Sequence, residues 1–125
     1  MMKKFIVLLV DDDSLQIEIL TTFLQASFGN IEFFEANNGK QALEIIKYQS
    51  DIDLVVSDIQ MPEMDGLEFV EAARLIIPNL PILLITGNMV YTPAEVKACG
   101  ANDLLYKPFT REMFIQSIRS ILSSI

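Results

Sequence analysis

Short apolar runs alternate along this chain with longer segments in which apolar residues recur every three or four positions. The runs have the length and aliphatic content of buried parallel strands, and the longer segments have the period of amphipathic helices. This alternation is typical of strand–helix units wound around a parallel sheet. The expected strands are 5–10, 31–36, 52–57, 81–86 and 104–106. The expected helices are 14–28, 40–48, 67–77, 93–99 and a last one from Thr110 to near the C-terminus.

Local signals support these boundaries. Ser14 can cap the first helix, and Gly29 and Asn30 form a stop signal after it. Thr110 can cap the last helix in the same way. No linker, internal repeat or low-complexity segment interrupts the pattern, and 125 residues is close to the commonest domain size. We therefore expect one domain over residues 1–125.

Composition narrows the function classes. A hydrophobic content of 51% is ample for a packed core, and the formal net charge of −8 argues against direct nucleic-acid binding. No apolar run approaches the roughly 18 residues of a membrane helix. The start, Met1-Met2-Lys3-Lys4-Phe5, superficially resembles a secretory leader, but its apolar stretch runs directly into three aspartates. We expect a cytoplasmic protein with no membrane insertion.

The cysteine and histidine content of the chain excludes several further kinds of chemistry. The single cysteine, Cys99, cannot form an internal disulfide, and we expect it to be a buried small hydrophobe. The chain has no histidine, which excludes imidazole metal ligands, histidine general bases and self-phosphorylation on histidine.

Polar residues follow four of the five expected strands. Three aspartates, Asp11, Asp12 and Asp13, follow the first, and Asp58 follows the third. Thr86 and Gly87 end the fourth, and Lys107 and Pro108 end the fifth. The carboxyl ends of parallel strands meet at one edge of a sheet, where open α/β sheets place their binding sites. Carboxylates crowded there repel by about 4 kcal/mol per pair at a separation of about 4 Å, so the cluster predicts a bound divalent cation.

Four motifs occur in order, each at the end of an expected strand: Val10-Asp11-Asp12-Asp13, Ser57-Asp58 through Asp65-Gly66, Ile85-Thr86-Gly87 and Tyr106-Lys107-Pro108-Phe109. With these motifs the chain resembles the receiver domain of bacterial two-component response regulators, and the chemotaxis regulators among them, over essentially its full length. The resemblance implies a flavodoxin-like, doubly wound three-layer α/β sandwich with five parallel strands in the order 2-1-3-4-5.

The resemblance also implies a site. Asp58 is the expected phosphoacceptor, and a carboxylate can act as the nucleophile in such a reaction. Mg²⁺ is the expected cofactor, because hard cations prefer oxygen ligands. Its expected ligands are Asp11, Asp12, Asp58 and the backbone carbonyl of Gln60. Thr86 and Lys107 are expected to contact the phosphoryl oxygens. Asp13 is expected to lie outside this site, at the helix start, where its charge favours the helix dipole.

Three further expectations come from comparison with the family pattern. The Lys107-Pro108 peptide should be cis. Leu104 stands where the family usually has an aromatic switch residue, and Tyr106 lies on the same face of the strand. We expect Tyr106 to pack rather than to take over the switch. Gln60 and Asn88 occupy the positions that flank the phosphate and tune its lifetime.

Partners also follow from the resemblance. The expected phosphodonor is a sensor histidine kinase or a histidine phosphotransfer protein. A downstream protein should bind the face formed by the fourth helix, fifth strand and fifth helix, and homodimerisation on phosphorylation stays open. Apart from its own phosphorylation and slow dephosphorylation, the domain is not expected to be an enzyme.

Alternatives from other classes stay open at this point. Asp11 and Asp13 fit the Asp-x-Asp signature of a haloacid-dehalogenase-like phosphatase, with Asp11 as nucleophile and Asp13 as acid. A flavodoxin-type cofactor binder lacks support, since no Ser/Thr/Gly-rich phosphate loop follows the first strand. A degenerate receiver that acts only as a docking module is the third alternative.

Overall fold

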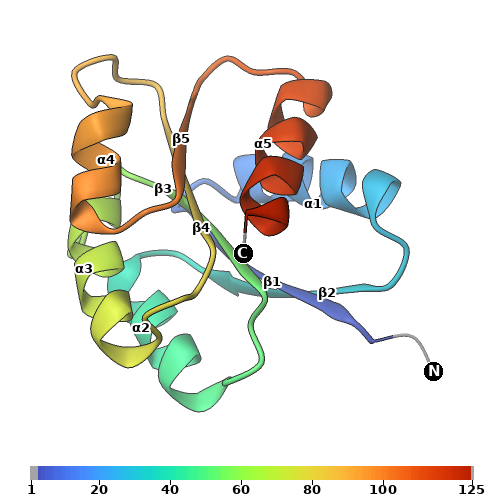
Figure 1. The fold of residues 1–125 in the computed structure, drawn as a ribbon, viewed down its shortest axis with the longest axis horizontal. Helices are drawn as coiled ribbons and strands as arrows, with labels where there is room; N and C mark the ends of the chain where they lie inside the picture. Colours follow the sequence, from blue (N-terminus) through green and yellow to red (C-terminus); the bar gives the residue numbers. More distant parts are fainter. Residues whose placement is uncertain (1–2, 125) are drawn as a thin grey trace.

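Five strands and five helices alternate along residues 3–124, which the computed structural model describes. The strands are β1 (Phe5–Val10), β2 (Ile31–Ala36), β3 (Leu54–Asp58), β4 (Ile82–Thr86) and β5 (Asp103–Tyr106). The helices are α1 (Ser14–Ser27), α2 (Gly39–Tyr48), α3 (Gly66–Ile76), α4 (Pro93–Cys99) and α5 (Arg111–Ser123). The strands pair in parallel in the order β2-β1-β3-β4-β5 (Figure 1), which confirms the expected fold class.

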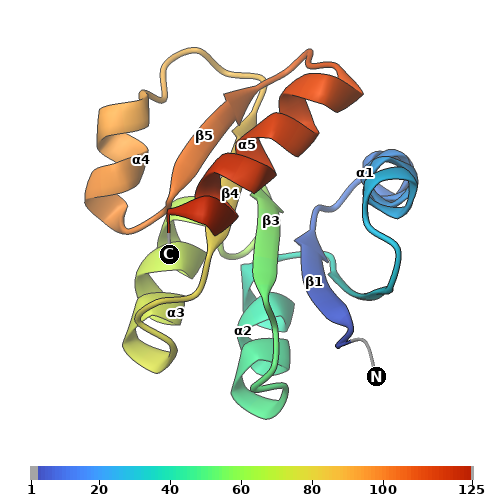
Figure 2. The same cartoon turned by 45° about the vertical axis from the view of Figure 1, so that its right-hand side comes forward.

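The sheet is the middle of three layers. Helices α1 and α5 cover one face, and α2, α3 and α4 cover the other (Figures 1 and 2). Successive strand side chains point to opposite faces. Val7 and Leu9 therefore join the core under α1 and α5, whereas Leu8 and Val10 join the core under the other three helices. The two cores bury β1, β3 and β4 almost completely, whereas the edge strands β2 and β5 are only partly buried.

The cap of α1 and the starts of five further elements differ by one or two residues from the sequence-based expectation. Helix α2 begins at Gly39, strand β4 at Ile82 and strand β5 at Asp103. Asp13, not Ser14, caps α1, because its carboxylate accepts a hydrogen bond from the Leu15 amide at 3.0 Å. Helix α3 begins one residue earlier than expected, at Gly66, where the preceding aspartate forms a capping box. Strand β3 begins at Leu54 rather than residue 52, since it pairs with β1 only from Leu54 onwards.

Three further expectations concern Cys99, membrane-spanning helices and the leader-like start of the chain. Cys99 is only half-buried, packs beside the core under α4 and donates its S–H to the Val96 carbonyl. Within residues 3–124, no helix has both the length and the apolar character needed to cross a membrane. The leader-like start includes Met1 and Met2, which lie outside the described residues.

Candidate functional site

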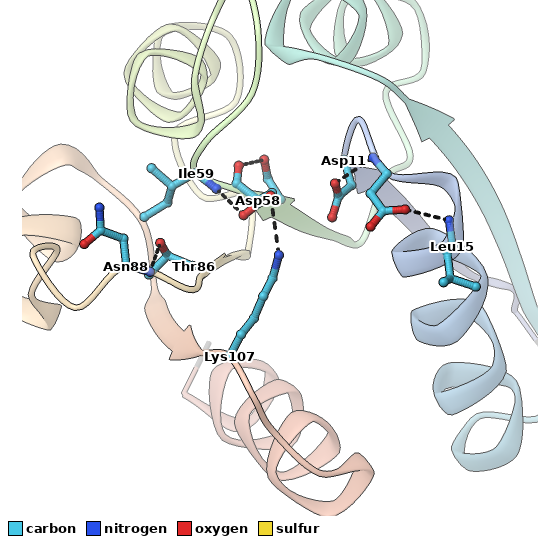
Figure 3. Close-up of polar contacts among 9 residues, drawn as sticks. Asp11, Leu15, Asp58, Ile59, Thr86, Asn88 and Lys107 are labelled. Carbon is cyan, nitrogen blue, oxygen red and sulfur yellow. Dashed lines mark hydrogen bonds and ion pairs between the residues drawn. The ribbon is translucent and has the colours of Figure 1, made fainter.

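The strand register gathers the expected site residues at one edge of the sheet. Asp58 ends β3 and Thr86 ends β4, while Asp11 and Lys107 follow directly after β1 and β5. The Lys107 amide donates a hydrogen bond to the Thr86 carbonyl at 2.8 Å, which fixes the two strand ends beside each other. Figure 3 shows Asp11, Asp58, Thr86 and Lys107 around one shared space.

Three carboxylates form the acidic part of this site. One oxygen each from Asp11, Asp12 and Asp58 lies within 4.8 Å of the other two. Asp11 is 4% exposed, and its carboxylate accepts a hydrogen bond from the Asp13 amide at 2.9 Å, which orients it. Asp12 is exposed and Asp58 is largely buried. The cluster therefore opens to solvent on the Asp12 side.

Burial makes the Asp11 and Asp58 carboxylates reluctant to ionise. Desolvation is the main cause that raises the pKa of Asp11 to about 6, and the charges of Asp58 and Asp12 add to it. Desolvation also raises the pKa of Asp58, while the nearby Lys107 ammonium opposes the shift. A divalent cation would offset both the burial and the mutual repulsion. The all-oxygen donor set suits Mg²⁺, so the residues present fit the expected ion.

Asp58 has two differently placed oxygens. Its Oδ1 accepts a hydrogen bond from the Ile59 amide at 3.0 Å. Its Oδ2 lies 3.6 Å from the Lys107 ammonium nitrogen, and Figure 3 shows the lysine side chain extending to it. The Lys107-Pro108 peptide is cis, as the family resemblance predicted. One oxygen of Asp58 is thus held by the backbone, and the other faces a cation.

Thr86 is fully buried, and its hydroxyl oxygen accepts a hydrogen bond from the Asn88 amide at 3.0 Å. The Asn88 side-chain oxygen in turn accepts from the Val90 amide at 3.0 Å. The first of these bonds, drawn in Figure 3, holds the start of the loop between β4 and α4 against the end of β4. In this bond the Thr86 hydroxyl is the acceptor, so its own proton is not used in it.

The remaining candidates lie on loops and on β5. Gln60 follows Asp58 by two residues, and its side chain is exposed. Leu104 is 7% exposed and packs in the core under α4. Tyr106 packs against the same core, as expected, and its hydroxyl also donates a hydrogen bond to the Tyr91 carbonyl. No local sequence pattern signals that last contact, because the two residues lie on different elements.

The 2-1-3-4-5 sheet, with three aspartates and a lysine at its carboxyl edge, places the chain among the doubly wound α/β proteins. Residues 7–119 match the response regulator receiver domain family, and the chain belongs to this family.

Similar proteins agree with this assignment. The chain is 30% identical over 121 residues to a chemotaxis protein CheY homolog of Campylobacter jejuni strain 81-176, covering 94% of this chain and 92% of that one. It is 38% identical over 103 residues to the transcriptional regulatory protein ZraR of Escherichia coli K12, covering 82% of this chain but only 23% of that protein. The chain thus spans about a quarter of the length of that relative. The structure of chemotaxis protein CheY4 of Vibrio cholerae superposes with a TM-score of 0.81 at 31% identity, covering 95% and 99% of the two chains.

Family membership excludes two of the three alternatives that the sequence left open. A receiver domain is not a catalytic enzyme beyond its own phosphorylation, which excludes the haloacid-dehalogenase-like phosphatase. The same match excludes a flavodoxin-type cofactor binder. The docking-only receiver is the alternative that an experiment has to separate from a phosphoacceptor.

Proposed function

We propose that this chain is the phosphoacceptor domain of a two-component phosphorelay and that Asp58 accepts a phosphoryl group from a histidine of a partner protein. The observation that carries the proposal is the unequal pair of oxygens on Asp58. The Ile59 amide fixes Oδ1, whereas Oδ2 faces the Lys107 ammonium at 3.6 Å. An oriented carboxylate with one oxygen beside a cation is suited to attack a phosphoryl group, whose own charge would otherwise repel it.

In the proposed step, an Asp58 oxygen forms a bond to phosphorus while the phosphorus–nitrogen bond of the donor phosphohistidine breaks. The imidazole nitrogen keeps the electron pair of that bond. Lys107 neutralises charge on the transferring oxygens, and the Thr86 hydroxyl donates a hydrogen bond to one of them. Mg²⁺, when bound, supplies further neutralisation, and Asp11, Asp12, Asp58 and the Gln60 carbonyl would hold it. Water then cleaves the acyl phosphate slowly.

The partners proposed from the family are a sensor histidine kinase or a histidine phosphotransfer protein upstream and a protein that binds the α4-β5-α5 face downstream. The net charge of −8 supports a protein rather than a nucleic acid as the direct partner. We place this activity in the cytoplasm, without membrane insertion, where two-component kinases present their phosphohistidine.

Phosphorylation by acetyl phosphate and Mg²⁺, followed by intact-protein mass spectrometry, tests the proposal. Wild type should gain one phosphoryl group, and Asp58→Asn should gain none, because an amide is a far poorer nucleophile. Asp12→Ala should react more slowly through weaker metal binding. Asp13→Asn is the matched control, since the Asp13 side chain caps α1, an asparagine keeps the capping oxygen, and the main-chain bond to Asp11 is unchanged.

Two results would contradict the proposal. Undiminished labelling of Asp58→Asn would show that another residue is the acceptor. A wild type that takes no phosphoryl group from acetyl phosphate or from any histidine donor would instead support the docking-only receiver.

Light scattering on the labelled and unlabelled protein measures whether phosphorylation also drives homodimerisation.

A further inference from the structure

The loop between β3 and α3 starts directly after the expected phosphoacceptor and carries Gln60. Its base is closed by a hydrogen bond from the Gly66 amide to the Ile59 carbonyl at 2.7 Å. A Cβ built on Gly66 would lie 2.6 Å from the Asp58 carbonyl oxygen, so only glycine permits this close approach. The base of the loop is therefore fixed against the strand end itself.

The far side of the loop is held by a residue from a different part of the chain. Asn38 precedes α2 and is 8% exposed. Its side-chain oxygen caps α2 by accepting from the Gln41 amide at 2.9 Å. Its side-chain nitrogen donates to the Glu63 carboxylate, also at 2.9 Å. One amide thus binds the helix start and the loop at the same time.

The backbone reinforces this contact. The Gly39 amide donates to the Met64 carbonyl at 3.2 Å. A Cβ on Gly39 would lie 2.8 Å from both the Met64 carbonyl oxygen and the Met64 Cγ, so the close approach of α2 to the loop depends on this glycine. The two ends of the contact are Asn38 with Glu63 and Gly39 with Met64.

The loop would not hold this shape on local preference alone. Glu63 has a φ of 67°, in the left-handed region that side chains with a Cβ avoid. The Met64 amide bonds to the Pro62 carbonyl at 2.8 Å across it, which makes a tight three-residue turn. The charge-assisted bond from Asn38 to the Glu63 side chain is the contact that can offset this unfavourable backbone.

We infer that Asn38 is a positioning residue for the divalent cation: through Glu63 it holds the β3–α3 loop in the shape that presents the Gln60 carbonyl to Asp11, Asp12 and Asp58. The inference rests on the metal site of the proposed function. Loss of the Asn38–Glu63 bond lets the turn at Glu63 relax toward negative φ, and Gln60, three residues earlier, moves with it. The cation then has one protein ligand fewer in place.

Magnesium titrations of the unphosphorylated protein, followed by backbone amide NMR shifts, test this role. Asn38→Ser keeps a capping oxygen for α2 but removes the donor to Glu63. It should weaken Mg²⁺ binding by about tenfold, the lower end of the effect of residues that orient metal ligands. Amide hydrogen exchange of Met64 should become faster in the same variant, while its urea unfolding midpoint should fall only by the amount expected for one lost hydrogen bond.

A double-mutant cycle separates the contact from a change in charge. Glu63→Ala and Glu63→Gln remove the same charge, but only Glu63→Gln keeps an acceptor for Asn38. Glu63→Ala should therefore bind Mg²⁺ several-fold more weakly than Glu63→Gln in the wild-type background. In the Asn38→Ser background the two should bind equally, because the donor is gone.

The possible results separate a failure of the positioning role of Asn38 from a failure of the metal site itself. Equal Mg²⁺ affinity of wild type and Asn38→Ser, with normal affinity in wild type, would overturn the positioning role and leave the metal site standing. A difference between Glu63→Ala and Glu63→Gln that persists without Asn38 would also overturn it. A wild type that binds no Mg²⁺ would remove the metal site itself and, with it, the inference.

Discussion

The Tyr106 hydroxyl donates a hydrogen bond to the main-chain carbonyl of Tyr91. This bond joins the last residue of β5 to the loop between β4 and α4. The same loop begins at Thr86, which lies opposite Tyr106 in the strand register. Leu104, which stands where the family usually carries an aromatic residue, is buried and has no hydroxyl to offer. Tyr106 therefore provides a polar link between β5 and this loop at Tyr91 that a leucine at position 104 cannot provide.

We predict that Tyr106→Phe loosens this loop without unfolding the domain. The variant keeps the ring in the core but loses one hydrogen bond, worth about 1 kcal/mol. Urea unfolding should show a loss of that size, and amide hydrogen exchange should accelerate at residues 88–92. Tyr48→Phe is the matched control, because Tyr48 is 78% exposed and its change should be close to neutral. Equal exchange in the two variants would contradict a role for the Tyr106 hydroxyl.

The raised pKa of Asp11 predicts how stability depends on pH. In the metal-free protein the pKa rises from 3.8 to about 6, so the folded state binds a proton that the unfolded state releases. Stability should therefore fall as pH rises from about 4 to about 6 and above. The loss from Asp11 is about 3 kcal/mol at most, and the raised pKa of Asp58 adds a loss of the same sign.

Asp11→Asn tests this account by removing the charge while keeping an oxygen for the Asp13 amide. In chelator-treated samples at about pH 7.5 the variant should unfold at a higher urea concentration than wild type, and the difference should vanish below about pH 4. Added Mg²⁺ should stabilise wild type but have little effect on the variant. A variant that is less stable than wild type at neutral pH without metal would contradict the burial penalty.

The lifetime of the acyl phosphate should depend on Asn88. Its side-chain oxygen is occupied by the Val90 amide, and an amide supplies no general base for the attacking water. Asn88→Glu should therefore lose its phosphoryl group several-fold faster than wild type. Asn88→Gln introduces a side chain as long as that of Asn88→Glu but without the charge. Its rate of phosphoryl loss should differ little from that of wild type. Phosphate release after removal of acetyl phosphate measures both, and a slower Asn88→Glu would refute the prediction.

Sequence reasoning predicted those features that depend on neighbours in the chain. The apolar runs predict the central strands because both faces of the sheet are buried there, and Asp58 and Lys107 meet because parallel strands end at one edge. The first cap was misplaced by one residue, since Asp13 and Ser14 can both cap a helix and only the fold decides between them. The Asn38–Glu63 and Tyr106–Tyr91 contacts join distant segments, so no local period could predict them.

Gly66→Ala should damage the site through its backbone. The added Cβ would lie 2.6 Å from the Asp58 carbonyl oxygen and 2.8 Å from the Ile59 Cα, and neither atom can rotate away. Overpacking of this kind should cost about 2–3 kcal/mol in urea unfolding and slow phosphorylation of Asp58. Gly29→Ala is the control, because a Cβ there meets nothing within 4 Å. A Gly66→Ala protein with wild-type stability and phosphorylation rate would disprove the close-approach argument.

The contact of Gly66 with Asp58 makes the two sides of the site mechanically unequal. On the α3 side, main-chain atoms meet main-chain atoms, so a displacement there would have to move the whole helix. On the β4 side, the loop from Thr86 to Tyr91 is held by individual hydrogen bonds, each of which can break and reform. A group added to Asp58, as proposed, would therefore meet more resistance from α3 than from the loop that leads to α4, so we expect displacements toward α4 and β5.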